Sequence, residues 1–229
     1  MTVEPHAPAG RAASAWSRRA WNMSEQKHQG IRAGGFVLAG GASRRMGRDK
    51  ALLEIGGEPL FLRAANLLKA HVDPVVLLGA PDQYASAGFL TLPDRSPGRG
   101  PLAALLDGLE YSAQPWNVFL ACDLPLLRGE FIELLLQRAA RGEFDAIVPR
   151  TSDGWQPLCA AYRRTCTPKI HDALKNGRLD IAGVLPGLRV DALRDEQLGV
   201  LTLDEEIFEN VNTPEDWQRV LLRTQRRPL

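Results

Sequence analysis

A short apolar run, two glycines and several cations follow one another near the start of the chain. The segment from Phe36 to Lys50 reads FVLAGGASRRMGRDK. Ala39, Gly40 and Gly41 allow a sharp turn after a strand, with no bulky side chain in front of the backbone. Backbone N–H groups that converge in such a turn bind anions, as they do at a helix N-terminus or in a nest. The segment therefore predicts a polyphosphate site.

The cations of this segment suit a phosphate ligand, but their spacing is not that of the commonest nucleotide loops. Arg44, Arg45 and Lys50 follow the two glycines. The segment lacks the Gly-x4-Gly-Lys-Ser/Thr pattern of P-loops and the GxGxxG pattern of dinucleotide folds, which argues against a P-loop ATPase and a dehydrogenase. Glycine and charge alone leave one alternative open, a tight strand exit followed by an exposed charged face.

Two acidic residues complete the first set of candidate site residues. Asp94 ends an apolar run that begins at Phe89, and Asp123 stands in the run from Val118 to Pro125. The carboxyl ends of parallel strands line one crevice, in which such folds bind their ligands. We therefore expect Asp94, Asp123 and the glycine segment to meet there, although they are far apart in the sequence.

The order of the expected elements supports this arrangement. Apolar runs that suit buried strands alternate with segments of helical periodicity. Such alternation predicts right-handed βαβ crossovers and an α/β fold with a mostly parallel sheet covered on both faces. The expected strands are 36–38, 74–80, 89–94, 118–125, 144–149 and 158–162, and the expected helices are 60–68, 102–109, 131–142, 167–176 and a last one that Thr213 caps and Pro214 begins.

Composition indicates one domain whose ligands are bound locally. The chain has 229 residues, 45% of them hydrophobic, which is enough for the core of one α/β domain. Its 28 basic and 27 acidic residues leave a formal net charge of +1, which argues against nucleic acid or a membrane surface as a partner. The three cysteines form no CxxC pattern, which favours reduced thiols in a cytoplasmic protein.

The two ends differ from the rest of the chain. Residues 1–30 mix Ala, Pro, Gly and Arg, and they contain neither a secretory apolar segment nor a membrane span. We expect a disordered lead over residues 1–30, with Met23 as an alternative start, one domain over 31–223, and a basic, solvated tail over 224–229.

Five segments carry a resemblance to a known family. Between about Gly35 and Val220 the chain contains, in this order, LAGGASRRMGRDK, DRSPGRGPLAAL, ACDLP, QPLCAAY and NVNTPEDW. Together they resemble the molybdenum cofactor guanylyltransferases, a branch of the nucleotidyltransferase superfamily. The resemblance implies that residues 31–223 form a single three-layer α/β/α, Rossmann-like nucleotidyltransferase domain with a mostly parallel sheet.

The resemblance also implies roles for individual residues. In this family the residues that match Leu38, Ala39 and Gly40 contact the nucleotide. The residue that matches Lys50 contacts the triphosphate. Residues that match Asp94 and Asp123 contact the nucleotide, and the second also binds Mg²⁺. This suits Asp123, because Mg²⁺ prefers hard oxygen ligands and usually takes only one or two carboxylates, together with phosphate oxygens and water.

Four further residues belong to the expected site. Gly41 continues the backbone cradle. Gly100 lies between a strand and a helix, where its backbone passes close to the base or ribose, with a plain turn as the alternative. Arg45, together with Lys50, neutralises the β and γ phosphates as pyrophosphate leaves. Asn212 contacts the metal or the acceptor by the resemblance, with a purely capping role as the alternative.

The implied reaction joins GTP to molybdenum-molybdopterin, with Mg²⁺ as cofactor. The terminal phosphate of the pterin attacks the α-phosphorus of GTP, giving the guanine dinucleotide cofactor and pyrophosphate. Recipient molybdoenzymes or their chaperones are further expected partners, and a monomer or weak oligomer is the expected state. Alternatives are a cytidylyltransferase acting on the same pterin, a sugar-phosphate nucleotidyltransferase, and a non-catalytic molybdopterin carrier.

The chain departs from the family pattern at two positions near the expected base. Ala104 stands where many relatives have glycine. Leu78 stands where some relatives have an asparagine that touches the nucleotide. Gly40 and Gly41 match the guanylyl form of the motif, so we expect guanine to be held, but by different contacts.

Overall fold

The computed structural model describes residues 31–39, 49–84, 87–96, 98–199, 203 and 205–226, without the side chains of 195, 225 and 226. The described residues from Arg32 onward belong to one unit. The whole of the lead expected over 1–30 lies outside the described residues. So do residues 227–229 of the tail and the expected site residues Gly40, Gly41 and Arg45.

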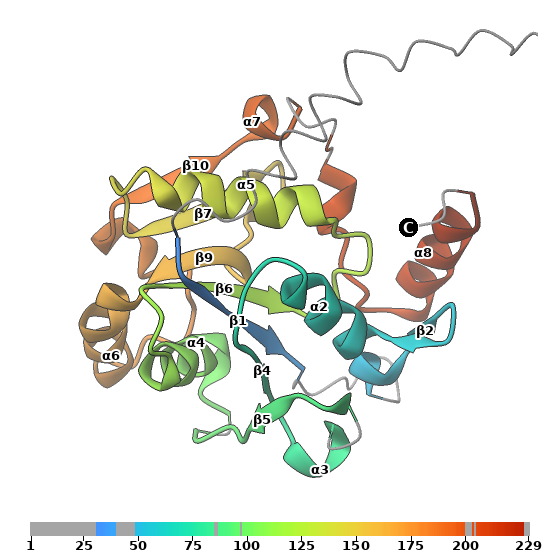
Figure 1. The fold of residues 1–229 in the computed structure, drawn as a ribbon, viewed down its shortest axis with the longest axis horizontal. Helices are drawn as coiled ribbons and strands as arrows, with labels where there is room; N and C mark the ends of the chain where they lie inside the picture. The colour runs from blue at the N-terminus through green and yellow to red at the C-terminus, as the bar shows by residue number, and fades with distance from the viewer. Residues whose placement is uncertain are drawn as a thin grey trace, which may run out of the picture. The chain divides into compact units, whose positions relative to one another are not determined.

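A mostly parallel sheet forms the middle of this unit, as the alternating pattern predicts (Figure 1). Its strand order is β10-β7-β9-β6-β1-β4-β5, and a short strand, β8, pairs with β7. The strands are β1 (Ala33–Leu38), β4 (Val75–Leu78), β5 (Leu90–Leu92), β6 (Trp116–Ala121), β7 (Ala146–Thr151), β8 (Gly154–Trp155), β9 (Cys159–Arg163) and β10 (Val190–Leu193). Every strand expected from an apolar run is present.

The register of the central strands places their ends at one edge. Leu38, the last residue of β1, lies opposite Leu78 of β4 and Ala121 of β6, and both pairings are parallel. β9 runs antiparallel to β6 and to β7. Its direction follows from its connection, because a hairpin through β8 links β7 to β9 with no room for a crossover helix.

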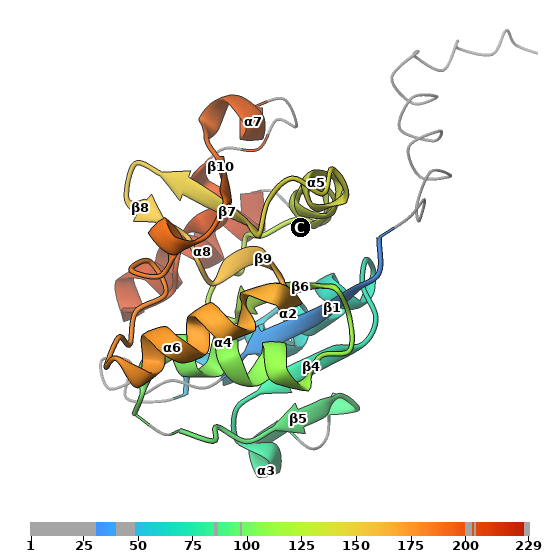
Figure 2. The ribbon, with the colours of Figure 1, turned by 90° about the vertical axis from the view of Figure 1, so that its left-hand side faces the viewer.

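Helices cover both faces of the sheet, with α2 and α5 on one face and α4 and α6 on the other (Figures 1 and 2). The sequence did not indicate α3, α7 or the short 3-10 turns, because segments of three to five residues carry no usable periodicity. The helices are α2 (Leu60–Lys69), α3 (Pro81–Tyr84), α4 (Gly100–Tyr111), α5 (Gly129–Ala140), α6 (Thr167–Lys175), α7 (Asp195–Gly199) and α8 (Pro214–Arg226), the 3-10 turns are η1 (Lys50–Leu52), η3 (Arg164–Cys166), η4 (Leu185–Gly187) and η5 (Glu205–Phe208), and β2 (Glu54–Ile55) pairs with β3 (Glu58–Pro59) as a hairpin.

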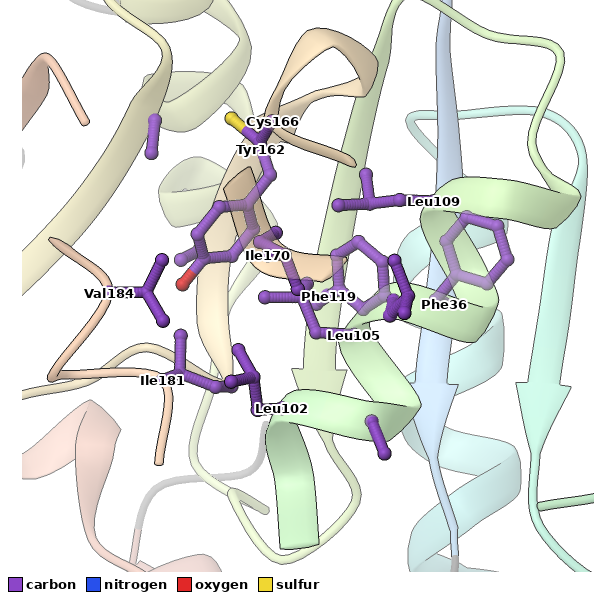
Figure 3. Packing of buried hydrophobic residues seen from close by; sticks show 14 of the residues in the cluster. Phe36, Leu102, Leu105, Leu109, Phe119, Tyr162, Cys166, Ile170, Ile181 and Val184 are labelled. Atoms are coloured by element: carbon purple, nitrogen blue, oxygen red, sulfur yellow. The ribbon is translucent and has the colours of Figure 1, made fainter. Parts of the chain in front are cut away.

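The core beneath α4 is built from aromatic rings and leucines (Figure 3). Phe36 of β1 stacks on Phe119 of β6 at a centroid distance of 4.9 Å, and Tyr162 of β9 meets Phe119 edge-on at 5.9 Å. Gly108 lets α4 approach these rings, since a Cβ at this position would lie 2.6 Å from Phe119 Cε1. The buried stripe of α4 consists of Leu102, Leu105, Leu106 and Leu109, the leucines that the periodicity indicated.

The last helix begins as expected and ends later. Thr213 Oγ1 accepts from the Asp216 N–H at 3.2 Å, and Asp216 Oδ2 accepts from the Thr213 N–H at 2.8 Å, a reciprocal cap. α8 continues to Arg226, so residues 224–226, which the sequence placed in the basic tail, belong to its last turn. No helix among the described residues combines the length and apolar character needed to span a membrane.

Candidate active site

A cavity of about 550 Å³ lies at the carboxyl ends of β6, β1, β4 and β5. This is the crevice that the parallel sheet predicts. The cavity brings together the expected site residues that the structure describes, namely Leu38, Ala39, Lys50, Asp94, Gly100 and Asp123.

Lys50 and Asp123 form an ion pair at one end of this cavity. Lys50 Nζ donates to Asp123 Oδ2, and it also donates to Asn212 Oδ1 at 3.2 Å. Lys50 lies in η1, where Asp49 caps the turn by accepting from the Ala51 N–H at 2.9 Å. Segments that follow β1, follow β6 and precede α8 thus converge on one ammonium group.

The side chain and the backbone of Asn212 have different partners. Its side chain faces Lys50, while its backbone N–H donates to Asp216 Oδ2 at 3.0 Å. The capping oxygen of α8 belongs to Thr213. The side-chain amide of Asn212 therefore contacts Lys50 and does not cap α8, and its contact with the metal or the acceptor stays a prediction.

The second oxygen of Asp123 has no hydrogen-bond donor in the described part of the chain. Asp123 Oδ1 is buried and accepts no hydrogen bond from the residues that the structure describes. A buried carboxylate oxygen without a donor is costly, unless a ligand completes it. The described residues contain no group of three or more His, Cys, Asp or Glu side chains placed to hold a metal. A single carboxylate, that of Asp123, fits Mg²⁺, because this ion takes one or two carboxylates and fills its other positions with phosphate oxygens and water.

Gly100 is required by its surroundings. It starts α4 with a φ of +72°, and a Cβ there would lie 2.9 Å from the Leu179 carbonyl oxygen. A side chain is excluded by both conformation and space. The backbone of α4 can consequently come close to whatever fills the cavity.

Asp94 lies at the rim, on the side of the cavity that follows β5. Its Oδ1 accepts from the Ser96 N–H at 2.8 Å, which shapes the turn after the strand. The structure confirms that Asp94 lines the same cavity as Lys50 and Asp123.

Tyr84 is a buried residue of this region that the sequence did not single out. Its hydroxyl donates to the Ala39 carbonyl at 2.5 Å and lies 3.2 Å from Asp49 Oδ2. Its ring packs on Phe61 at a centroid distance of 4.7 Å. Burial, and then the negative charge of Asp49, raises the pKa of the Tyr84 phenol, which keeps it protonated as a donor. The hydroxyl thereby links the two residues that flank 40–48.

Asp107 of α4 is the second such residue. It lines the cavity, is only 9% exposed, and accepts from the Arg95 N–H at a long 3.4 Å. Burial raises the pKa of Asp107, and the Arg95 N–H opposes that effect. No sequence pattern marked Asp107, because it lies on the side of α4 away from the leucine stripe, where a charged residue is ordinary.

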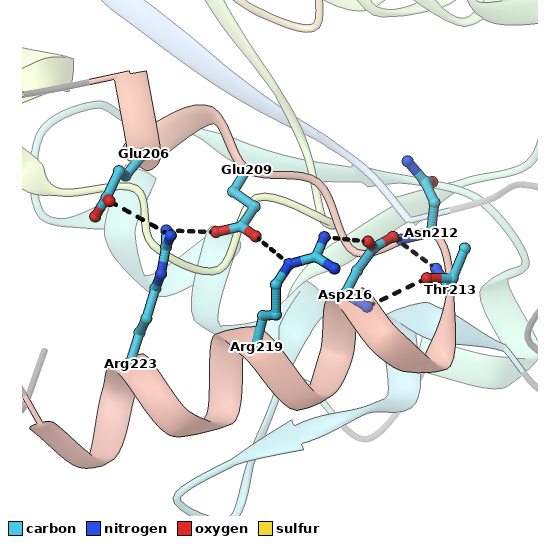
Figure 4. Close-up of polar contacts among 7 residues, drawn as sticks. All are labelled: Glu206, Glu209, Asn212, Thr213, Asp216, Arg219 and Arg223. Atoms are coloured by element: carbon cyan, nitrogen blue, oxygen red, sulfur yellow. Dashed lines mark hydrogen bonds and ion pairs between the residues drawn. The ribbon is translucent and has the colours of Figure 1, made fainter.

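Alternating charges hold the start of α8 in place (Figure 4). Arg219 bridges Asp216 and Glu209 at 2.5 and 3.2 Å, and Arg223 bonds Glu209 at 2.6 Å and Glu206 at 3.4 Å. Exposed ion pairs of this kind add little stability individually. Their effect here is orientation, because Asp216 also accepts from the backbone of Asn212.

A family model, described as the MobA-like NTP transferase domain, matches residues 35–189. The chain belongs to this family. The transferase is 38% identical over 195 residues to a probable molybdenum cofactor guanylyltransferase of Synechococcus elongatus, covering 82% of this chain and 97% of that protein. It is 34% identical over 187 residues to a protein of the same name from Pelotomaculum thermopropionicum, covering 81% and 90%.

A solved structure agrees with the fold. Molybdopterin-guanine dinucleotide biosynthesis protein A from Archaeoglobus fulgidus superposes with a TM-score of 0.70 at 24% identity, covering 84% of this chain and 99% of that one. The family membership and this likeness confirm the nucleotidyltransferase fold that the five sequence segments implied. The family membership and the two relatives also show that the chain is a nucleotidyltransferase enzyme.

Proposed function

We propose that the transferase moves GMP from GTP to the terminal phosphate of molybdenum-molybdopterin, giving the guanine dinucleotide cofactor and pyrophosphate. The observation that carries this proposal is the convergence of Lys50, Asp123 and Asn212 at one end of the cavity. An ammonium, a carboxylate with a free oxygen and an amide are the groups that a triphosphate and its metal ion require. The relatives named above support the choice of guanine and pterin.

The strand order suggests how GTP lies in the cavity. Asp123 follows β6, Leu38 ends β1 with Ala39 directly after it, and Asp94 follows β5. Three strand spacings of about 4.8 Å separate β6 from β5, or about 14 Å, which suits an extended nucleoside triphosphate. We place the triphosphate at Lys50 and Asp123 and the nucleoside toward Asp94 and Gly100.

The proposed chemistry needs charge stabilisation more than proton transfer. A phosphate oxygen of the acceptor is already anionic, so it can attack the α-phosphorus without a general base. Lys50 stabilises the negative charge that collects on the departing pyrophosphate. Asp123 Oδ1 would hold Mg²⁺, which when bound supplies further neutralisation of the phosphate oxygens. Asn212 fixes the direction of the Lys50 ammonium.

The proposal also includes the remaining expected nucleotide-binding residues and partners. Leu38 and Ala39 offer their backbone to the nucleotide, Gly40 and Gly41 continue that cradle, and Arg45 adds positive charge. Recipient molybdoenzymes or their chaperones are the partners that the product implies. We also keep the cytoplasm as the proposed compartment, since the three cysteines are free and buried. A monomer or weak oligomer stays the proposed state.

Thermal-shift titrations with GTP, CTP, ATP and UTP, each with and without Mg²⁺, test the proposal. A ligand that binds only the folded protein raises the melting temperature, by an amount equivalent to about 2.7 kcal/mol at 100 times its Kd. We expect the largest rise with GTP and Mg²⁺ together. A rise with CTP and none with GTP would instead assign a cytidylyl activity.

A further inference from the structure

One side of α4 lines the cavity and carries a carboxylate. Gly100, Ala104 and Asp107 of α4 follow one another at i, i+4 and i+7, so they lie on one side of the helix, and all of them line the cavity. The first two carry little or no side chain. On this side of α4, Asp107 is therefore the side chain that can form hydrogen bonds with a ligand.

Asp107 is buried and forms no ion pair with the side chains that the structure describes. The Arg95 guanidinium bonds Glu110 at 3.4 Å. Asp107 Oδ2 has only the long bond from the Arg95 N–H, and Oδ1 has no hydrogen bond within the described part of the chain. A buried carboxylate normally has stronger partners than these. The carboxylate oxygens of Asp107 can therefore accept hydrogen bonds from a ligand in the cavity.

Asp107 also lies at the nucleoside end. Lys50 and Asp123 mark the triphosphate end, next to β6 and β1. Asp107 contacts the backbone of Arg95, which follows β5, the edge strand on the other side. The inference rests on the proposed function, because it takes the triphosphate to be bound at Lys50.

Among the four common bases only guanine matches a carboxylate here. Its N1–H and its N2 amino group point the same way and can donate to two oxygens together. Adenine and cytosine have an acceptor nitrogen beside the amino group, and uracil has a single N–H between two carbonyls. We propose that Asp107 is the specificity-determining residue of the transferase and accepts both hydrogen bonds from guanine. This contact explains how guanine is selected although Leu78 and Ala104 depart from the family pattern.

Asp107→Asn provides the test, because asparagine has the same shape and can still accept from Arg95. Its amide N–H₂ would oppose the guanine amino group but would pair with the C2 carbonyl of xanthine. We expect wild type to prefer GTP over ITP, which lacks the amino group, and over XTP. In Asp107→Asn, kcat/KM for GTP should fall about 5- to 150-fold, the range for one bidentate contact to a base. The GTP preference over ITP should disappear and XTP use should rise.

Rates of pyrophosphate release with molybdenum-molybdopterin and Mg²⁺, and nucleotide affinities by calorimetry, provide the readouts. Glu130→Gln is the control, since this carboxylate is exposed on α5 and does not line the cavity, so the variant should leave base preference unchanged. A merely structural role of Asp107 would lower all three rates in parallel, and an unchanged GTP, ITP and XTP pattern in Asp107→Asn would overturn the proposal. If wild type neither bound nor used GTP, the proposed function itself would fail.

Discussion

Replacing Tyr84 with phenylalanine removes one hydroxyl group that joins two backbone segments at the cavity. The hydroxyl lies 2.5 Å from the Ala39 carbonyl and 3.2 Å from Asp49 Oδ2. The ring and its packing on Phe61 stay the same in the variant. Tyr84→Phe therefore isolates the link between the residues before and after 40–48, where Gly40, Gly41 and Arg45 are expected to bind phosphate.

The size of the effect follows from burial. Ala39 is 2% exposed, and no other described residue donates to its carbonyl oxygen, so the variant leaves a buried acceptor unsatisfied. Such a loss costs about 1–3 kcal/mol. For a unit of this size, each kcal/mol lowers the melting temperature by about 2–4 °C. We expect a decrease of about 2–12 °C.

Kinetics separate a positioning role from a loss of stability. We expect Tyr84→Phe to raise KM for GTP several-fold and to lower kcat less, because the groups that contact the reacting phosphates remain. Ser112→Ala is the stability-matched control. Its hydroxyl makes a buried hydrogen bond to Asn117 Oδ1 at 2.5 Å, near the opposite end of the strands.

The two variants differ in the KM for GTP that we expect. Ser112→Ala should lower the melting temperature and leave KM for GTP unchanged. If Tyr84→Phe matched wild type in both melting temperature and KM, or if both variants raised KM equally, the reasoning about Tyr84 would be refuted.

Three further predictions concern other parts of the molecule. Asp216→Ala should destabilise the protein by about 0.5–2 kcal/mol through loss of the cap. It should also raise KM for GTP, because the Asn212 N–H loses its hydrogen bond to Asp216. Unchanged denaturant unfolding and unchanged kinetics would contradict this prediction. Gly108→Ala should cost about 1–3 kcal/mol in thermal unfolding, because the added methyl group meets Phe119, and a wild-type melting temperature would contradict the packing. Burial raises the pKa of the Cys166 thiol to about 12, so we expect a thiol reagent at pH 8 to label it only after unfolding, whereas rapid labelling of the native protein would show that the thiol is accessible.

Much of the fold follows from local patterns in the sequence. Strands buried on both faces read as continuous apolar runs, and the 3.6-residue period of α4 marks its leucine stripe. The direction of β9 does not follow from such patterns, because a strand has the same composition whichever way it runs. It depends on the hairpin at β8, whose two residues are too few to recognise.

The candidate site was predictable only where its residues end strands. Asp94 and Asp123 end apolar runs, and a parallel sheet brings such ends together, so their convergence with Lys50 could be expected. Tyr84 and Asp107 could not be found in this way. Tyr84 is part of a helix of a single turn, and Asp107 lies on the side of α4 away from the leucine stripe, where it lines the cavity and accepts from the Arg95 N–H.

Formation of the dinucleotide product with wild type and Asp123→Asn tests the central claim most directly. Asparagine can still accept from Lys50, but it loses the charge that would hold Mg²⁺. With GTP, Mg²⁺ and molybdenum-molybdopterin, mass spectrometry should detect the guanine dinucleotide cofactor from wild type, and at least about 100-fold less per unit time from the variant, with both proteins melting cooperatively. Equal rates from the two proteins, or a product formed from CTP and not from GTP, would contradict the account.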